Sequence, residues 1–434
     1  MKARPEPTNV QDVFLPRLED MLNPRHHLYA LAAAIRWSDL ETALAPLYAE
    51  IGRPAKPIRL MVALLILKQL HNLSDEETVA QWQESGYWQY VSGEQIFQWK
   101  PPCTPSEMTH FRNRIGEAGI EAVFKASVVI HGDTAQEAEQ IADTTVQPKN
   151  ITFPTDSKLA LKVIDECRRI AKREGVRLRQ SYVRVIKRER WLLRYHKHPK
   201  RAQQARSAQR TIKTIGGRLV RELRRTLPEE AQQRHAAMLE RCARVLQQKR
   251  EDKHKVYSLH EPDVVCYAKG KAHVQYEFGS KVALLVTKRT GIITGLVNFT
   301  ESIYDGNTLA PLLASSERLT GRRATKVIVD EGYQGQTQCG TTEIIRPYQL
   351  RVKPQQAKNK GFSKRRVKEW FNRRASIEPR IGHLKSDFRL NKNFLKGIQG
   401  DVINAMMAAT ASNLRIFIRE MLCWFLRCFA MHAF

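Results

Sequence analysis

The chain has 434 residues, of which 42% are hydrophobic and 27% are charged. This composition supplies enough apolar side chains for folded cores and so excludes a disordered chain. The length allows two or three domains of ordinary size. Lys and Arg number 72 against 44 Asp and Glu, a formal net charge of +28 at pH 7. Such an excess of positive charge indicates a polyanionic partner.

The sequence predicts neither a membrane span nor a secreted, disulfide-bonded protein. Its longest uncharged stretch near the C-terminus, residues 402–414, contains Asn, Thr and Ser and is shorter than the roughly 18 apolar residues of a span. No apolar run follows the charged first residues, as a signal peptide would require. The seven cysteines are scattered and form no CxxC pair, so we expect no disulfide framework and no zinc site.

Residues 1–135 are predicted to form a helical domain. The apolar run from Ile58 to Leu70 predicts a buried helix. Helix starts follow at Ser74 and at Thr104, and Thr104 is followed by proline and, at the third position, by glutamate, the pattern of a capping box. The second of these helices carries two basic side chains suited to contact DNA, Arg112 and Arg114. A DNA-binding helix-turn-helix and a purely structural helical domain both fit this pattern.

Residues 158–255 contain 30 Lys and Arg against 10 Asp and Glu, a net charge of +20. Apolar residues at helical spacing and few helix breakers predict a basic helical hairpin or small bundle there. Arg-rich helices are often no more than solvated surfaces. With so few balancing acids, we favour a surface that contacts the phosphates of nucleic acid.

From about residue 256 the pattern changes to that of strands. Runs rich in Val, Ile, Tyr, Phe and Thr predict consecutive antiparallel strands at 264–267, 273–278, 281–287 and 292–299. A helix capped by Asp305 is predicted next, through residue 319. It is followed by a buried strand over 324–329, a short strand over 342–346, helix from about residue 364, and an apolar tail over 416–434 for packing or self-association.

Three carboxylates stand out among these elements. Asp143 interrupts a strand-like run, Asp330 closes a buried strand, and Glu378 lies in the final helical region. Each one alone has an ordinary explanation as a cap or turn residue. Together, in a cationic chain that meets phosphate, they suggest a site for two Mg²⁺ ions about 3.5–4 Å apart, because hard cations take oxygen ligands and activate a water or hydroxyl for phosphoryl transfer.

Three blocks of this sequence resemble those of the DDE transposases of bacterial insertion sequences. The blocks are residues 143–156, 330–335 and 374–385. The third is the most specific, because the family pattern Tyr-x2-Arg-x3-Glu-x6-Lys brings Arg374, Glu378 and Lys385 into register. The group named for insertion sequence five is the most similar, and the resemblance extends over about residues 35–415.

The resemblance implies an α/β fold with an RNase H-like catalytic domain, a mixed sheet with helices. Asp143 would lie on its first strand, Asp330 after its fourth and Glu378 on a helix, as catalytic residues that hold Mg²⁺, with Mn²⁺ as a substitute. The domains expected are a helical N-terminal domain (1–135), the catalytic domain (136–157 and 256–415), a basic helical insertion (158–255) and the tail (416–434). The insertion explains why the two aspartates are 187 positions apart.

The resemblance also implies contacts with DNA near the metal site. Arg374 and Lys385 would contact phosphate from the helix of Glu378, although an ordinary pairing with that glutamate is the alternative. Cations of the predicted hairpin, which are Lys269, Lys271 and Lys281, would hold a DNA strand or be merely solvated. The sequence departs from the family pattern at Phe371, which replaces the tyrosine, and at Glu331, an extra carboxylate beside Asp330.

The function expected is hydrolysis at each transposon end to free a 3′-OH, followed by attack of that hydroxyl on target DNA. The partners would be double-stranded DNA, as terminal inverted repeats and as target, and further copies of the chain, because two ends held together require at least a dimer. We expect a cytoplasmic bacterial protein associated with the nucleoid. A metal-dependent nuclease that does not join DNA and a non-catalytic DNA-binding protein are the alternatives.

Overall fold

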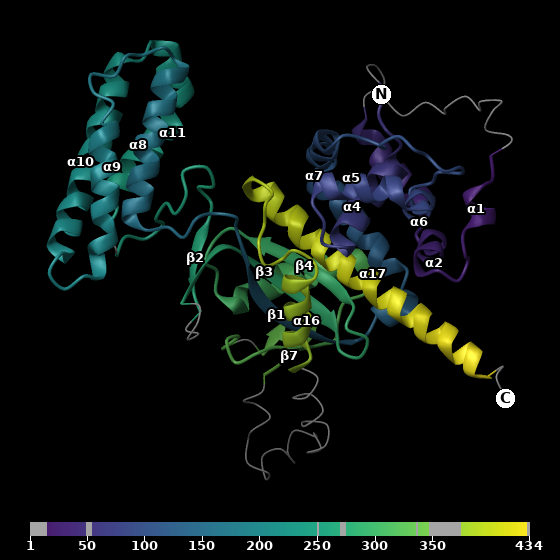
Figure 1. The fold of residues 1–434 in the computed structure, drawn as a ribbon. Coiled ribbons are helices and arrows are strands. Elements are labelled where there is room, and N and C mark those ends of the chain that lie inside the picture. The colour runs from purple at the N-terminus through teal and green to yellow at the C-terminus, as the bar shows by residue number, and fades with distance from the viewer. Residues whose placement is uncertain are drawn as a thin grey trace, which may run out of the picture. The chain divides into compact units, whose positions relative to one another are not determined.

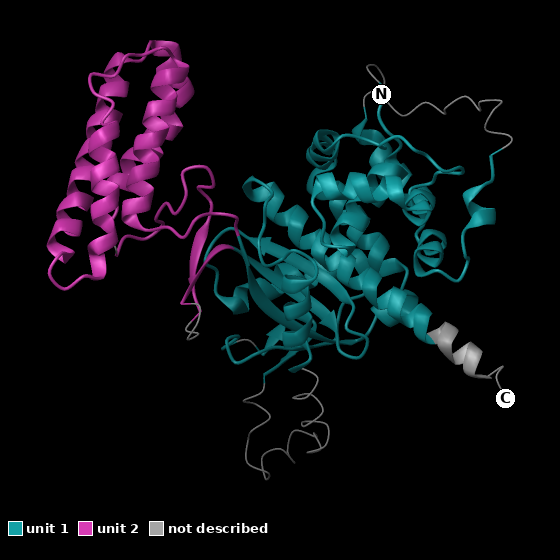
Figure 2. Ribbon diagram, viewed as in Figure 1, with its two compact units in different colours: residues 1–148, 280–434 teal, residues 149–279 magenta. Residues whose placement is uncertain are grey.

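The computed structural model describes residues 15–48, 54–249, 251–269, 275–335, 337–346 and 375–431, with backbone alone from residue 424. The chain divides into two compact units, which Figure 2 shows in teal and magenta. Unit 1 comprises Met1–Pro148 and Ser280–Phe434, and unit 2 comprises Lys149–Gly279.

The N-terminal part of unit 1 is helical, as predicted. Its helices are α1 (Leu18–Met21), α2 (His27–Ala34), α3 (Trp37–Leu44), α4 (Ile58–Leu70), α5 (Asp75–Glu84), α6 (Gly86–Val91) and α7 (Pro105–Val129), with 3-10 turns η2 (Ala45–Leu47) and η3 (Gly132–Ala135). Ser74 and Thr104 cap α5 and α7 with complete capping boxes. Because α6 and residues 92–104 separate these two helices, they are not the consecutive pair of a helix-turn-helix.

The sheet of unit 1 is mixed. Its strands are β1 (Glu139–Pro148), β3 (Tyr276–Thr287, which starts in unit 2), β4 (Ile293–Phe299), β5 (Lys326–Ile328), β6 (Gln338–Cys339) and β7 (Thr342–Ile345). The order is β4-β3-β1-β5-β7-β6 (Figure 1). Strands β1, β5 and β7 run parallel, whereas the β3–β4 and β6–β7 pairs are antiparallel.

Two predicted strands, 273–278 and 281–287, prove to be parts of the single strand β3, although residues 270–274 lie outside the described part of the chain. Gly279 and Ser280 suggested a turn, but the backbone stays extended through them. The first part of β3 pairs with β2 (Val265–Ala268) and the second part with β4. Continuous pairing with neighbouring strands therefore overrides the local turn propensity.

Alternate residues of the sheet enter two separate cores. One face, with Ala142, Leu285 and Val327, packs on α12 (Leu309–Thr320). The other face, with Ile141 and Ile328, joins the core of α16 (Ile377–Ser386), α17 (Gly397–Met431) and the N-terminal helices. Since α17 contacts α4, α7 and β4 (Figure 1), the N-terminal helices and the sheet share one core and form one unit. No described helix, α17 included, has the length and apolarity needed to span a membrane.

Unit 2 is built around four helices, consistent with the helical pattern of residues 158–255. They are α8 (Asp156–Arg173), α9 (Val183–Leu192), α10 (Ala202–Thr226) and α11 (Glu229–Gln247), with the 3-10 turn η4 (Leu193–Lys197) after α9. On α10 the buried residues Ile212, Ile215 and Leu219 form an apolar stripe at helical spacing. This stripe packs in a core shared with α8, α9 and α11, so the basic side chains are left mainly on the outside.

Candidate active site

Asp143 lies on β1, and Asp330 follows β5, the parallel neighbour of β1 in the sheet. The pairing of β1 with β5 ends with Ile141 opposite Ile328, so each aspartate lies two residues beyond the last paired position of its segment. Both isoleucines belong to the core on the α16 and α17 face. Because side chains of a strand alternate, Asp143 shares the face of β1 that carries Ile141, whereas Asp330 lies just beyond the end of β5.

A third carboxylate lies near these strand ends. Asp305 begins the 3-10 turn η5 (Asp305–Thr308), and Thr308, not Asp305, is the cap of α12. The phenol of Tyr333 is fully buried. Its burial, together with the charges of Asp143, Asp305 and Asp330, raises the pKa of Tyr333. These three carboxylates, called the acidic cluster below, all lie near enough to Tyr333 to raise the pKa of its phenol.

Asp305 connects this cluster to Lys281. Its Oδ1 accepts hydrogen bonds from Lys281 Nζ at 2.9 Å and from the Thr144 hydroxyl at 2.9 Å. The Lys281 ammonium also donates to the carbonyl of Ile303 at 2.7 Å, and its side chain is only 13% exposed. Lys281 is therefore an internal partner of Asp305, which corrects its prediction as a DNA contact. Sequence reasoning missed this role of Asp305, whose only local signal was the Asp-Gly turn.

Gly332 leaves room beside two of the acids. Its backbone N–H donates to Asp330 Oδ1 at 2.6 Å. A Cβ at this position would lie 2.8 Å from that oxygen and 3.3 Å from Asp305 Oδ2. Asp143 Oδ1 likewise accepts from the next backbone N–H, that of Thr144, at 2.7 Å. The site thus combines a backbone N–H donor to each aspartate with space that any larger residue at 332 would fill.

Glu378 comes from helix α16, which packs on the same face of the sheet. Ile377 and Leu384 anchor the helix in the core that contains Ile141, and α16 contacts β1. Glu378 itself is exposed. No group of three or more His, Cys, Asp or Glu side chains in the described ranges is arranged to hold a metal ion. The structure thus carries Asp143 on β1, Asp330 just after the neighbouring strand β5 and Glu378 on a helix that contacts β1, and the described residues do not close the three into a ligand set.

The two basic residues predicted on α7 have different surroundings. Arg112 is 6% exposed and donates from both ends of its guanidinium to Asp75, at 2.8 and 2.6 Å. It therefore holds α7 to α5, which corrects its prediction as a DNA contact. Arg114 is exposed, with its guanidinium 4.9 Å from the centre of the Tyr48 ring, so it remains available to a ligand.

The remaining predicted DNA contacts are partly outside the described residues. Lys385 is half-buried on α16, two helical turns from Glu378 and so on the same side of the helix. In unit 2, Lys269 forms an ion pair with Glu277 at 3.5 Å. Lys271 and Arg374, together with Phe371 of the third block, lie outside the part of the chain that is described.

Two family models match the chain. Residues 16–114 match the model described as "Transposase domain (DUF772)", and residues 243–414 match the one described as "Transposase DDE domain". An uncharacterized protein of Rhizobium meliloti, ORF8 in the nfe locus, is 46% identical over 182 residues, which cover 41% of this chain and 88% of that protein. The chain belongs to the DDE transposases of bacterial insertion sequences. No solved structure matches this transposase.

Membership of this family settles the class of activity. The transposase is an enzyme whose substrate is DNA, and DDE transposases generally use divalent metal ions. The match of residues 243–414 includes Asp330, Glu378 and Lys385. It begins inside unit 2 and leaves Asp143 outside, so the role of Asp143 stays a prediction from the sequence resemblance.

Proposed function

We propose that this transposase binds the terminal inverted repeats of an insertion sequence, cleaves the DNA ends by hydrolysis and joins the freed 3′-OH ends to target DNA. The observation that carries the proposal is the parallel pairing of β1, which bears Asp143, with β5, which Asp330 follows two residues after its end. Helix α16, which bears Glu378, contacts β1 and packs in the core that contains Ile141 and Ile328. These positions support the proposal that the three predicted catalytic residues act together.

We infer an RNase H-like fold for the catalytic part. Leaving out β2 and β6, the strands in chain order are β1, β3, β4, β5 and β7, with Asp143 on the first and Asp330 after the fourth. This is the placement that the family resemblance implies. The mixed sheet, with antiparallel strands on one side of β1 and parallel strands on the other, supports the same inference.

The acids present fit Mg²⁺, with Mn²⁺ as a substitute. Mg²⁺ takes oxygen ligands and is usually bound through one or two carboxylates, a number that Asp143 and Asp330 supply. When bound, the metal would activate the attacking hydroxyl and stabilise the leaving oxygen. The protein residues would hold the cation at the strand ends, with Glu378 as the third carboxylate and Gly332 leaving space for the DNA phosphate.

Cations from several parts of the chain would orient the DNA. Lys385 and Arg374 lie in the third sequence block with Glu378, and we assign them to phosphate contacts. Lys269, Lys271 and Arg114 are assigned to the DNA backbone, and the basic outer surface of unit 2 offers further sequence-independent contacts. Because two ends must be held for joining, the active form is at least a dimer. Its action on chromosomal DNA places it in the cytoplasm with the nucleoid.

The test uses a labelled duplex that carries the terminal repeat flanking the gene. Purified wild-type protein, Glu378→Gln and Asp143→Asn are incubated with Mg²⁺, Mn²⁺ or EDTA, and Glu331→Gln, an exposed carboxylate beside Asp330, is the matched control. We expect metal-dependent cleavage at the repeat boundary and joined product from wild type and control, and binding without cleavage from the other two. Cleavage without joining would identify a nuclease, and binding without cleavage under every condition would identify a DNA-binding protein.

A further inference from the structure

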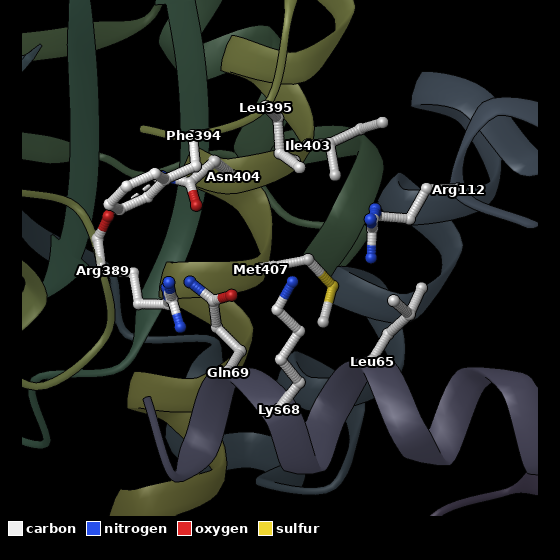
Figure 3. A pocket seen from close by; sticks show the side chains of 10 residues that line it. All are labelled: Leu65, Lys68, Gln69, Arg112, Arg389, Phe394, Leu395, Ile403, Asn404 and Met407. Atoms are coloured by element: carbon white, nitrogen blue, oxygen red, sulfur yellow. Dashed lines mark hydrogen bonds between the residues drawn. The ribbon is translucent and has the colours of Figure 1, made fainter. Parts of the chain in front are cut away.

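A pocket of unit 1 is lined by cations and by none of the carboxylates of the candidate active site. It consists of two cavities of about 550 and 40 Å³ that share Lys68, Arg112 and Arg389 in their lining. Lys68 comes from α4, Arg112 from α7, and Arg389 from the segment after α16. Figure 3 shows these three side chains around the pocket, with the Gln69 side chain between Arg389 and Lys68 in this view.

One buried carboxylate faces these three cations. Asp75 Oδ1 accepts from Lys68 Nζ at 2.6 Å, and both Asp75 oxygens accept from Arg112. The guanidinium of Arg389 donates to the carbonyl of Leu73, which carries no net charge.

The pocket is therefore left with an excess of positive charge. At the rim of the pocket, the opposite charges of the exposed Glu76 and Lys396 side chains cancel. Burial, and then the charge of Arg112, lower the pKa of Lys68 despite its ion pair. Excess positive charge is costly at side chains as little exposed as those of Lys68 and Arg112, and a bound anion would lower that cost.

The backbone of Arg389 has an uncommon conformation. Its φ is 61°, in the left-handed region that residues other than glycine rarely adopt. Asn404 donates from Nδ2 to the Arg389 carbonyl at 3.1 Å. Glycine would adopt the same φ without strain, so an arginine-to-glycine change at this position removes the side chain without straining the backbone.

An exposed aromatic ring completes the lining. Phe394 is 53% exposed, although apolar side chains of this size are usually buried. Arg389 Cζ and Lys392 Nζ each lie 5.4 Å from the centre of its ring. An aromatic surface beside cations is the combination by which proteins hold a nucleotide, with the phosphate on the cations and the nucleoside on the ring.

We propose that this pocket binds one nucleotide of the DNA substrate, with its phosphate between Arg389 and Lys68 and its nucleoside against Phe394. The volume of about 550 Å³ accommodates a group of this size. The inference rests on the proposed function, because it takes the bound DNA to be a transposon end. The pocket would add a DNA contact outside the acidic site.

The test compares DNA binding of Arg389→Gly, Arg389→Lys and Phe394→Ala with wild type. Lys125→Ala, which removes one exposed charge of α7 outside the pocket, is the matched control. Affinity for the terminal-repeat duplex is measured by fluorescence anisotropy in EDTA between about 50 and 200 mM salt. Arg389→Gly should keep the fold, because glycine suits the observed φ, and urea unfolding checks this directly.

We expect Arg389→Gly to lower affinity roughly tenfold and to reduce the slope of log K against log salt by about 1, the loss of one phosphate contact. Arg389→Lys should keep the slope, Phe394→Ala should lower affinity with an unchanged slope, and the control should match wild type. Unchanged affinity and slope in Arg389→Gly would overturn the proposal. Because this binding assay contains EDTA, its result does not depend on metal-dependent cleavage. A failure of the proposed function would appear in the cleavage assay instead.

A second measurement distinguishes DNA from a free phosphate compound. Thermal unfolding of wild type and Arg389→Gly is followed in inorganic phosphate and in chloride at equal ionic strength. Stabilisation of wild type alone, with the expected loss of DNA affinity in the variant, supports a phosphate site that DNA occupies. Stabilisation of wild type by phosphate with no change in DNA affinity of the variant would assign the pocket to a small phosphate compound and refute our assignment.

Discussion

Arg112→Met should destabilise unit 1 by about 3 kcal/mol, as the buried contacts of this residue indicate. Its guanidinium donates to both oxygens of Asp75, at 2.8 and 2.6 Å, with the two side chains only 7% and 15% exposed. Hydrogen bonds to charged groups contribute about 1.5–3 kcal/mol each, which for two bonds gives roughly 3–6 kcal/mol. Because Lys68 stays 2.6 Å from Asp75 and keeps the carboxylate paired, we expect the lower end of that range.

The assay is equilibrium unfolding in urea, with Arg114→Met as the matched control. Arg114 lies two residues away on α7 but is exposed, and its cation–π contact with Tyr48 contributes at most about 1 kcal/mol. The midpoint should therefore fall clearly for Arg112→Met and little for Arg114→Met, at an unchanged slope. If Arg112→Met kept its stability and lost DNA affinity instead, the structural role assigned to Arg112 would be refuted.

Three further predictions concern single side chains. Burial raises the pKa of the Asp75 carboxyl, but Arg112 and Lys68 outweigh burial, so that the pKa is lowered overall. The stability advantage of wild type over Asp75→Asn should therefore be constant near neutrality and shrink as the pH falls below about 3.8. Urea titrations at several pH values measure this difference. Gly332→Ala should reduce cleavage at least tenfold with DNA affinity within twofold in gel-shift assays, because the new Cβ meets a carboxylate oxygen at 2.8 Å. Lys281→Met should cost about 2–3 kcal/mol in urea unfolding, since it strips Asp305 of a buried partner, and equal stability with weaker DNA binding would contradict this.

Local signals in the sequence were sufficient for most elements. The helix over Ile58–Leu70 and the capped starts at Ser74 and Thr104 follow from patterns within a few residues, and the structure confirms them. Strand β1 around Asp143 was predicted for the same reason. The family was also readable from sequence, because its blocks depend on residue identity and spacing along the chain, and the match of residues 243–414 to the transposase DDE model confirms it.

Tertiary structure decided which of the predicted residues can meet a ligand. From the sequence alone, no acidic partner was predicted for Arg112 or Lys281. In the structure Arg112 pairs with Asp75, 37 positions away, and Lys281 pairs with Asp305, 24 positions away. The sequence also could not indicate that Asp305 joins the acidic cluster, or that Arg389 faces Lys68 across a pocket. Whether a charge is available depends on partners that folding brings together, and spacing along the chain carries no information about that distance.

The register of the sheet was likewise decided by long-range pairing. Strand β3 runs through Gly279 and Ser280 because its neighbours bond to it on both sides of that point. The β1–β5 pairing, which brings the strand of Asp143 beside the strand that Asp330 follows, joins segments 187 positions apart. By itself, therefore, the sequence determined the local elements, the basic character and the family, since these depend on near neighbours and residue identity. Bringing the strand of Asp143 beside the strand that ends before Asp330 required the sheet, because hydrogen bonds between distant strands set the register.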